Sequence, residues 1–221
     1  MIQIKNVTKT FDINKEKITA LKNVTLNIKE GNVIVLKGSS GSGKSTLLSL
    51  ISALSKPTSG EVIVDEKHIS KLSDDFASIY RRDNIGIIFQ RYNLIPNLSA
   101  FENILLPQIP LNPNKKTIKL HVENIMKKFH IHHKKDVIVK NLSGGEQQRI
   151  AIARSYINTP KIILADEPTA NLDKKLSLSF IEILKELKQT NLTIVIATHD
   201  PLFFGLDFVD EEIELKNGEI V

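Results

Sequence analysis

Two glycine-rich segments of the chain combine residue types that bind phosphate groups. The first, residues 38–45 (GSSGSGKS), is a complete P-loop pattern of Gly, four residues, Gly, Lys and Ser. Its backbone N–H groups would surround phosphate oxygens, while Lys44 would reach the β- and γ-phosphates and the Ser45 hydroxyl would ligate Mg²⁺. The second, residues 142–149 (LSGGEQQR), also places small residues before an expected helix, where an anion binds well. Because the chain has two such segments but one P-loop lysine, we predict that two copies share each nucleotide.

The residues around the first segment predict the strand and the helix that a P-loop requires. Residues 33–36 are apolar and rich in β-branched side chains, which is typical of a buried strand. Behind Lys44, five apolar residues have the spacing of the inward face of a helix, namely Leu47, Leu48, Leu50, Ile51 and Leu54. This context disfavours the alternative of a Gly/Ser-rich surface loop. The residues expected to bind nucleotide here are Gly38, Ser39, Ser40, Gly41, Ser42, Gly43, Lys44, Ser45 and Thr46.

Two acidic residues follow a second apolar strand, residues 161–165. An Asp at the carboxyl end of such a strand is the usual Mg²⁺ partner in P-loop NTPases, so we expect Asp166 to ligate the metal. Glu167 comes next, where a carboxylate could polarise a water molecule aligned with the γ-phosphate. The alternative for either acid is a purely structural role, in which it caps the turn before Pro168.

A histidine follows the third apolar strand, residues 193–197. His199 would lie at the ligand-binding edge of an open α/β sheet, where the carboxyl ends of parallel strands meet. A single histidine is more often structural, but three strand ends that converge on one edge favour contact with phosphate. We therefore expect Lys44, Glu167 and His199 to be catalytic.

Taken together, these residues resemble the nucleotide-binding subunit of ABC transporters over essentially the whole chain, and segment 142–149 is the most specific match. The resemblance implies ATP and Mg²⁺ as cofactors, ATP hydrolysis, a transmembrane permease subunit as partner and a homodimer that forms on ATP. It also implies that Ser143, Gly144 and Gly145 contact the γ-phosphate held by the opposite subunit. Glu146 is counted with them in the nucleotide site.

Further roles are carried over by position. Gln90 resembles the Q-loop glutamine, which would contact Mg²⁺ and relay the nucleotide state to the membrane partner. Phe11 occupies the aromatic position that stacks on adenine, where Tyr is more common. Residues 171–173 (NLD) resemble the D-loop at the dimer interface, and His199 resembles the switch histidine. The resemblance thus implies Ser45, Gln90 and Asp166 as metal ligands.

A finer resemblance rests on residues 92–99 (YNLIPNLS) and 164–169 (LADEPT). They are similar to the branch that contains lipoprotein-releasing ATPases, macrolide exporters, antimicrobial-peptide resistance pumps and the cell-division ATPase. Substrate export, lipoprotein release and mechanotransmission stay open within this branch. The alternative from another class is a DNA-repair or chromosome-maintenance ATPase with a similar signature. Such proteins are expected to carry a long coiled coil or zinc cysteines, and neither is present in the sequence.

Composition limits the partners. The net charge of +5 comes from 30 basic and 25 acidic residues, and the lysines are scattered with little aromatic interleaving, so no nucleic acid is expected. The absence of cysteine excludes disulfides and Cys-based zinc sites. No apolar run approaches the ~18 residues that span a bilayer. We expect peripheral attachment, through the partner, to the cytoplasmic face of the inner (plasma) membrane. Residues 130–133 (HIHH) are interpreted as a solvated helix end, because neighbouring lysines oppose a metal cation.

The fold class predicted from these elements is α/β, a P-loop NTPase with a parallel core sheet, an N-terminal antiparallel β-subdomain and an inserted α-helical subdomain. Strand-like segments at 2–7, 24–28 and 61–64 indicate the β-subdomain. A helix stripe formed by Ile118, Val122, Ile125 and Phe129 indicates the helical subdomain.

The expected organisation is one ABC ATPase domain over 1–221. Residues 1–90 and 142–221 would form the catalytic core with its β-subdomain, and about 91–141 the helical subdomain. Pro107, Pro110 and Pro113 predict a loop within it. Asn217-Gly218 predicts a two-residue hairpin near the C-terminus.

Overall fold

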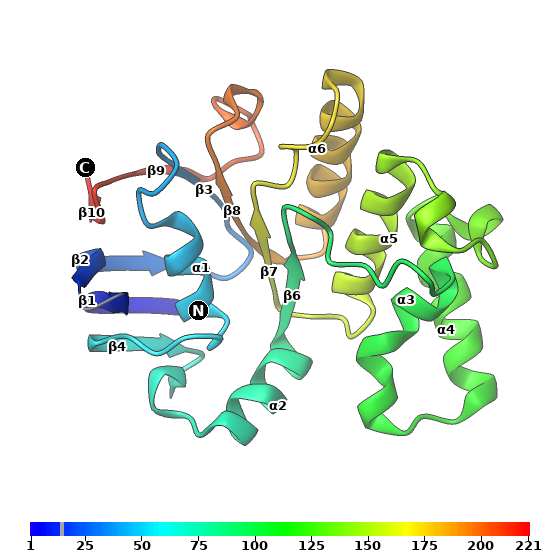
Figure 1. Ribbon diagram of the computed structural model, residues 1–221, viewed down its shortest axis with the longest axis horizontal. Helices are drawn as coiled ribbons and strands as arrows, with labels where there is room; N and C mark the ends of the chain where they lie inside the picture. Colours follow the sequence, from blue (N-terminus) through cyan, green and yellow to red (C-terminus); the bar gives the residue numbers. More distant parts are fainter. Residues whose placement is uncertain (14–15) are drawn as a thin grey trace.

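Two sheets that differ in strand direction form the body of the molecule (Figure 1). The computed structural model describes residues 1–13 and 16–221. The smaller sheet is antiparallel with the order β2-β1-β4-β5. Its strands are β1 (Ile2–Ile13), β2 (Glu16–Ile28), β4 (Ser59–Val64) and β5 (Lys67–His68).

The larger sheet has the order β10-β9-β3-β8-β7-β6, and all its neighbours pair in parallel except β10 with β9. Because its connections cross over through helices, both faces of the sheet are covered, as parallel sheets require. The strands are β3 (Val33–Lys37), β6 (Ile85–Ile88), β7 (Ile162–Asp166), β8 (Thr193–Thr198), β9 (Glu211–Lys216) and β10 (Glu219–Ile220).

Alternate residues of β3 face two separate cores. Ile34 and Leu36 pack with the antiparallel sheet and with α1 (Lys44–Ile51), which contacts both sheets. Val33 and Val35 pack on the opposite side with residues of α5 (Gly144–Tyr156) and α6 (Lys174–Lys188). All four side chains are 0% exposed, and each such burial contributes about 1.5–3 kcal/mol. The strand is therefore fixed on both faces, which holds the loop that follows it in place.

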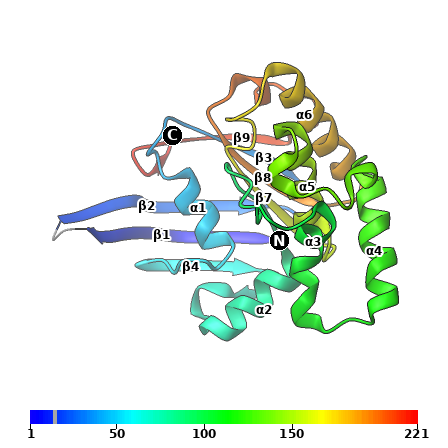
Figure 2. The same ribbon diagram turned by 45° about the vertical axis from the view of Figure 1, so that its right-hand side comes forward.

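A helical segment lies at the end of the molecule away from the antiparallel sheet (Figures 1 and 2). The stripe Ile118, Val122, Ile125 and Phe129 is buried against α3 and α5. The remaining helices are α2 (Asp74–Asn84), α3 (Ala100–Leu105), α4 (Lys115–Lys128) and the short 3₁₀ helices η1 (Ile69–Lys71), η2 (Leu106–Leu111), η3 (His132–Lys134), η4 (Val139–Asn141) and η5 (Pro201–Phe203).

The predicted fold class is confirmed, with two local differences. Leu54 was expected on the inward face of the P-loop helix, and this is wrong: α1 ends at Ile51 and Leu54 is 54% exposed. The helix ends because Ala53, after the C-cap Ser52, adopts the left-handed conformation with φ 52°, as residues that follow a helix often do. The second difference is that η2 occupies part of the proline-rich loop, which a short 3₁₀ helix allows with Pro107 near its start.

Within residues 1–13 and 16–221, no helix combines the length and the apolar character needed to cross a membrane. The same residues contain no group of three or more His, Cys, Asp or Glu side chains placed to hold a metal ion.

Candidate nucleotide-binding site

The P-loop joins the carboxyl end of β3 to the N-terminus of α1, and glycines give it the required backbone. Gly43 is the N-cap of α1 with φ 109°, and a Cβ atom there would lie 2.6 Å from the Ala20 carbonyl oxygen. Gly41 has φ 79°, a conformation that L side chains rarely adopt. The loop therefore keeps its backbone open around the N-terminus of α1, where N–H groups and the helix dipole favour an anion.

Lys44 is held at the base of this loop with its side chain 5% exposed. Its Nζ donates to the Gly38 carbonyl at 2.7 Å and to the Ser39 carbonyl at 3.1 Å, and it lies 3.3 Å from Glu167 Oε1. A buried ammonium with its donors spread over the loop is well placed to turn toward phosphate oxygens, which are stronger acceptors than carbonyls.

Replacing Lys44 with Ala is expected to weaken ATP binding by about 10–100-fold, because a hydrogen bond to a charged group contributes about 1.5–3 kcal/mol. Equilibrium binding of a fluorescent ATP analogue measures this directly. The control is Lys37→Ala, which removes a lysine that pairs with Glu212 at 3.0 Å and does not line the cavity described below. Unchanged affinity of the Lys44 variant would contradict the role given to this ammonium.

Ser45 and Asp166 bring two oxygen ligands side by side. The Ser45 hydroxyl donates to Asp166 Oδ1 at 2.8 Å, across the gap between α1 and the end of β7. Burial raises the pKa of Asp166, the Ser45 hydrogen bond opposes that rise, and the nearby Glu167 charge adds to it. Hydroxyl and carboxylate oxygens are the donors that Mg²⁺ prefers, so this pair fits the metal that accompanies a triphosphate. Bound Mg²⁺ would also relieve the cost of keeping Asp166 charged.

Glu167 lies between the side chains of Lys44 and His199. Its Oε2 is 2.9 Å from His199 Nδ1 and accepts from the His199 backbone N–H at 3.3 Å, while Oε1 faces Lys44. The residue has φ 44°, a left-handed conformation that is costly for a side chain of this size, and its own N–H donates to the Ala197 carbonyl at 2.8 Å. The Glu167 side chain is 14% exposed, and its carboxylate lines the cavity beside Lys44 of the P-loop.

These groups surround a cavity of about 360 Å³. Gln90 and His199 line it from two further strand ends, so the converging strand ends predicted from the sequence do meet here. Ala20 of β2 also lines it, and nothing in the sequence pattern indicated that residue. The lining is Ala20, Ser40, Gly41, Ser42, Gly43, Lys44, Ser45, Thr46, Gln90, Glu167 and His199.

One observation that does not depend on the P-loop motif also indicates that a triphosphate fits this cavity. The Ser42 hydroxyl of the P-loop is buried and has no hydrogen-bond partner among the described residues, whereas buried polar atoms are usually hydrogen-bonded. Together with the Ser45–Asp166 oxygens and the Lys44 ammonium, it supplies donors for phosphate and ligands for Mg²⁺. ATP with Mg²⁺ is thus compatible with the residues present.

Phe11 lies outside the lining of this cavity. It is half-buried on β1, where it pairs in register with Ile18 of β2, and the Lys9 ammonium lies 4.9 Å from its ring centroid. One face of the ring thus carries a cation.

Residues 142–149, the signature segment, also lie outside this cavity, at the N-terminus of α5, and the turn at Ser143 to Gly145 is the signature turn. Ser143 is the N-cap, and it forms a capping box with Glu146: Glu146 Oε2 accepts from the Ser143 N–H and hydroxyl, both at 2.8 Å. Gly144 has open space where a Cβ would stand, whereas a Cβ on Gly145 would press on the Leu176 side chain. The turn is therefore narrow and exposed on one side.

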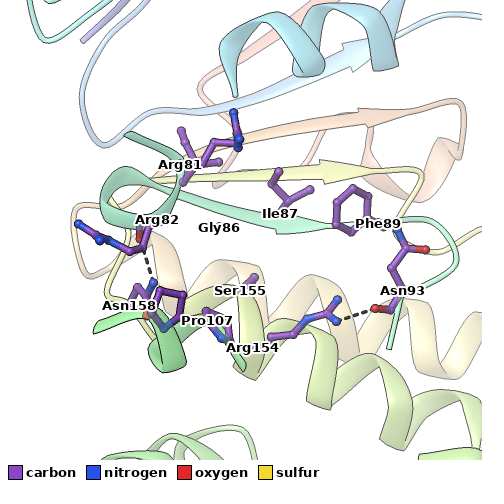
Figure 3. Close-up of a pocket in the computed structure, with 12 residues that line it drawn as sticks. Arg81, Arg82, Gly86, Ile87, Phe89, Asn93, Pro107, Arg154, Ser155 and Asn158 are labelled. Carbon is purple, nitrogen blue, oxygen red and sulfur yellow. Dashed lines mark hydrogen bonds between the residues drawn. The ribbon is translucent and has the colours of Figure 1, made fainter. Parts of the chain in front are cut away.

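The Gln90 loop is held by residues that sequence reasoning missed. Arg154 of α5 donates to the Asn93 carbonyl at 2.6 Å (Figure 3). It also donates to the Tyr92 carbonyl, and both Tyr92 and Asn93 have positive φ. Asn171 of the D-loop segment donates to the Gln90 carbonyl at 2.9 Å. No sequence signal identifies Arg154, because an arginine on a helix is usually a surface residue.

Comparison with known proteins places the chain in a family. The family described as ABC transporter matches residues 21–170. The chain is 45% identical over 230 residues to the uncharacterized ABC transporter ATP-binding protein MJ0796 of Methanocaldococcus jannaschii, a match that covers 100% of this chain and 95% of MJ0796. The structure of this chain is similar to the dimeric post-hydrolysis structure of MJ0796 bound to ADP and Pi. The TM-score is 0.91, with 43% sequence identity, and the match covers 100% of this chain and 96% of that one.

Two longer relatives match a part of their own length. The macrolide export ATP-binding/permease protein MacB of Campylobacter jejuni is 42% identical over 221 residues, covering 100% of this chain and 34% of MacB. The methionine import ATP-binding protein MetN of Histophilus somni is 42% identical over 201 residues, covering 90% of this chain and 58% of MetN. With a matched family profile, a shared fold and a site whose residues fit a triphosphate, the chain belongs to the ABC transporter family, as an ATP-binding domain that hydrolyses ATP.

Proposed function

We propose that the chain is the ATP-driven subunit of a membrane transporter and that two copies close head to tail on two Mg-ATP molecules. The observation that carries the proposal is the separation of the two phosphate-binding segments. Residues of the P-loop line the 360 Å³ cavity, and the signature turn at Ser143 does not. The signature turn that contacts a nucleotide held by one P-loop would thus come from a second subunit. The MJ0796 cassette, a relative of this chain, has been seen as a dimer.

The predicted site residues have the following tasks in this proposal. Lys44 and the P-loop amides bind the phosphates, and Ser45, Asp166 and Gln90 hold Mg²⁺, which when bound neutralises charge on the phosphate oxygens. Glu167 accepts a proton from the attacking water and so activates it. His199 anchors the Glu167 carboxylate and faces the transferring group, while Phe11 stacks on the base.

The permease partner is proposed to dock in a groove beside the Gln90 loop. This groove has a volume of about 360 Å³ and lies between α2 and β6 on one side and η2 and α5 on the other (Figure 3). Arg154 reaches from its wall to the loop backbone, so a segment seated in the groove would press on the same loop that faces the nucleotide. The residues of about 91–141 are proposed to act as a helical subdomain that moves with the partner. The groove lining includes Arg81, Arg82, Phe89, Asn93, Pro107 and Arg154.

Within the family we propose the branch of export, lipoprotein release or mechanotransmission, attached at the cytoplasmic face of the membrane. Similarity to MacB over the whole of this chain supports that branch, and the importer MetN, which matches less of the chain, shows how closely the cassettes resemble one another. The DNA-repair or chromosome-maintenance alternative is not favoured, since the relatives reported above are transporter proteins.

The dependence of turnover on protein concentration tests the shared site. If two chains complete each site, phosphate release per chain is expected to rise with chain concentration and to level off once dimers dominate. In a reference reaction, the chain concentration is fixed and the ATP concentration is raised. This reaction distinguishes the effect of dimer formation on turnover from saturation of the site with ATP. The proposal would be contradicted if turnover per chain stayed constant down to dilutions at which light scattering detects monomers alone.

A further inference from the structure

Residues 130–135, between α4 and the signature turn, contain a cluster of His and Lys side chains that the nucleotide chemistry described above does not use. Two of its lysines form separate ion pairs. Lys134 Nζ lies 3.0 Å from Glu146 Oε1, and Lys135 Nζ lies 2.7 Å from Glu123 Oε1 on α4. The first pair alone reaches the signature turn, so the two neighbouring lysines have different surroundings.

Glu146 places a fixed negative charge at the turn that has to receive phosphate. Hydrogen bonds from Ser143 and the nearby Lys134 lower the pKa of Glu146 to about 2, so its carboxylate stays charged at neutral pH. One oxygen, Oε2, is bound to Ser143, and the other, Oε1, faces Lys134. Without Lys134, this charge would oppose a triphosphate that approaches the N-terminus of α5, because like charges at close range repel.

We propose that Lys134 is a positioning residue of the signature turn: its ammonium neutralises Glu146 and keeps the carboxylate folded back on the helix cap. The turn then presents Ser143 and the N–H groups of α5 to the nucleotide of the opposite subunit without a net negative charge. This inference rests on the proposed sharing of ATP between two subunits, and it gives Lys134 a role in that step.

The test compares Lys134→Met with the matched variant Lys135→Met, which removes an equal charge one residue away. In a Glu167→Gln background, Lys134→Met is expected to raise the ATP concentration for half-maximal dimerisation about fivefold, the effect of one partly exposed ion pair. Lys135→Met is expected to leave it unchanged, and Lys134→Arg to restore it. Light scattering measures dimerisation, and a fluorescent ATP analogue at low protein concentration should show unchanged binding to the monomer.

A second substitution distinguishes charge neutralisation from a general loss of structure. In a Glu146→Gln background no carboxylate needs neutralising, so Lys134→Met is expected to have no effect on dimerisation. An equal shift in both backgrounds, or no shift with Glu146 present, overturns the inference even if ATP-dependent dimers form. If the Glu167→Gln protein forms no dimers with ATP at all, the proposed function fails as well, and the two failures are thereby distinguished.

Discussion

Glu167→Gln is expected to lower ATP turnover by about 10²–10⁴-fold, the contribution of a positioned general base, and to leave ATP bound. The amide keeps the shape of the carboxylate and can still accept from the His199 N–H, but it cannot take a proton from water. Lys44 loses an ionic contact at 3.3 Å and becomes free for phosphate, so binding should not weaken. Because the triphosphate persists, a dimer that contains ATP should accumulate. Steady-state phosphate release and size-exclusion chromatography with ATP measure the two effects.

The control for Glu167→Gln is Glu212→Gln, which alters a Glu paired with Lys37 at 3.0 Å on strands outside the cavity. That variant is expected to turn over ATP at the rate of the unmodified protein. Full activity of Glu167→Gln would falsify the assignment of Glu167 as the group that activates water. Loss of ATP binding in this variant would show instead that Glu167 mainly keeps the P-loop in shape through Lys44.

Ser143→Arg is expected to reduce hydrolysis by about 10²-fold or more while the monomer still binds ATP, since misplacing the group that completes a reacting site has this effect. The arginine would fill the narrow turn at the start of α5 and keep the opposite subunit's nucleotide away from Gly145. The P-loop cavity does not include Ser143, so its own affinity should be unaltered. Phosphate release, and binding of a fluorescent ATP analogue to the dilute protein, measure these two properties.

The structure offers a matched control for Ser143→Arg in Ser99, which caps α3 with the same capping box through Glu102. Ser99→Arg loses an equivalent helix cap, at a cost of about 1 kcal/mol, without touching the signature turn. Equal losses of turnover in the two variants would mean that helix capping explains the effect. A Ser143→Arg monomer that no longer binds ATP would contradict the sharing of one nucleotide by two subunits.

Much of the nucleotide site is predictable because its parts are short contiguous segments. The backbone of residues 38–45 is set by glycines at fixed spacing, and the flanking strand and helix follow from local hydrophobic pattern. Asp166, Glu167 and His199 could be predicted to lie together because each stands at or just after the end of a buried strand, and parallel strands bring their carboxyl ends to one edge. The Asn217-Gly218 hairpin and the apolar stripe of α4 are similarly local.

The tertiary structure decided what depends on elements far apart in the chain. Arg154 reaches the backbone of the Gln90 loop only because α5 packs beside β6, and Lys134 of η3 meets Glu146 of α5 through a contact between two separate elements. Phe11 lies outside the cavity, and its position likewise depends on tertiary packing, here of the antiparallel sheet against α1. Local spacing encodes backbone conformation, whereas these contacts depend on packing between whole elements. The phosphate-binding segments can therefore be recognised in the sequence, because local spacing sets their backbone conformation. The side chains that contact these segments from other elements, such as Arg154 and Lys134, are known only from the folded structure.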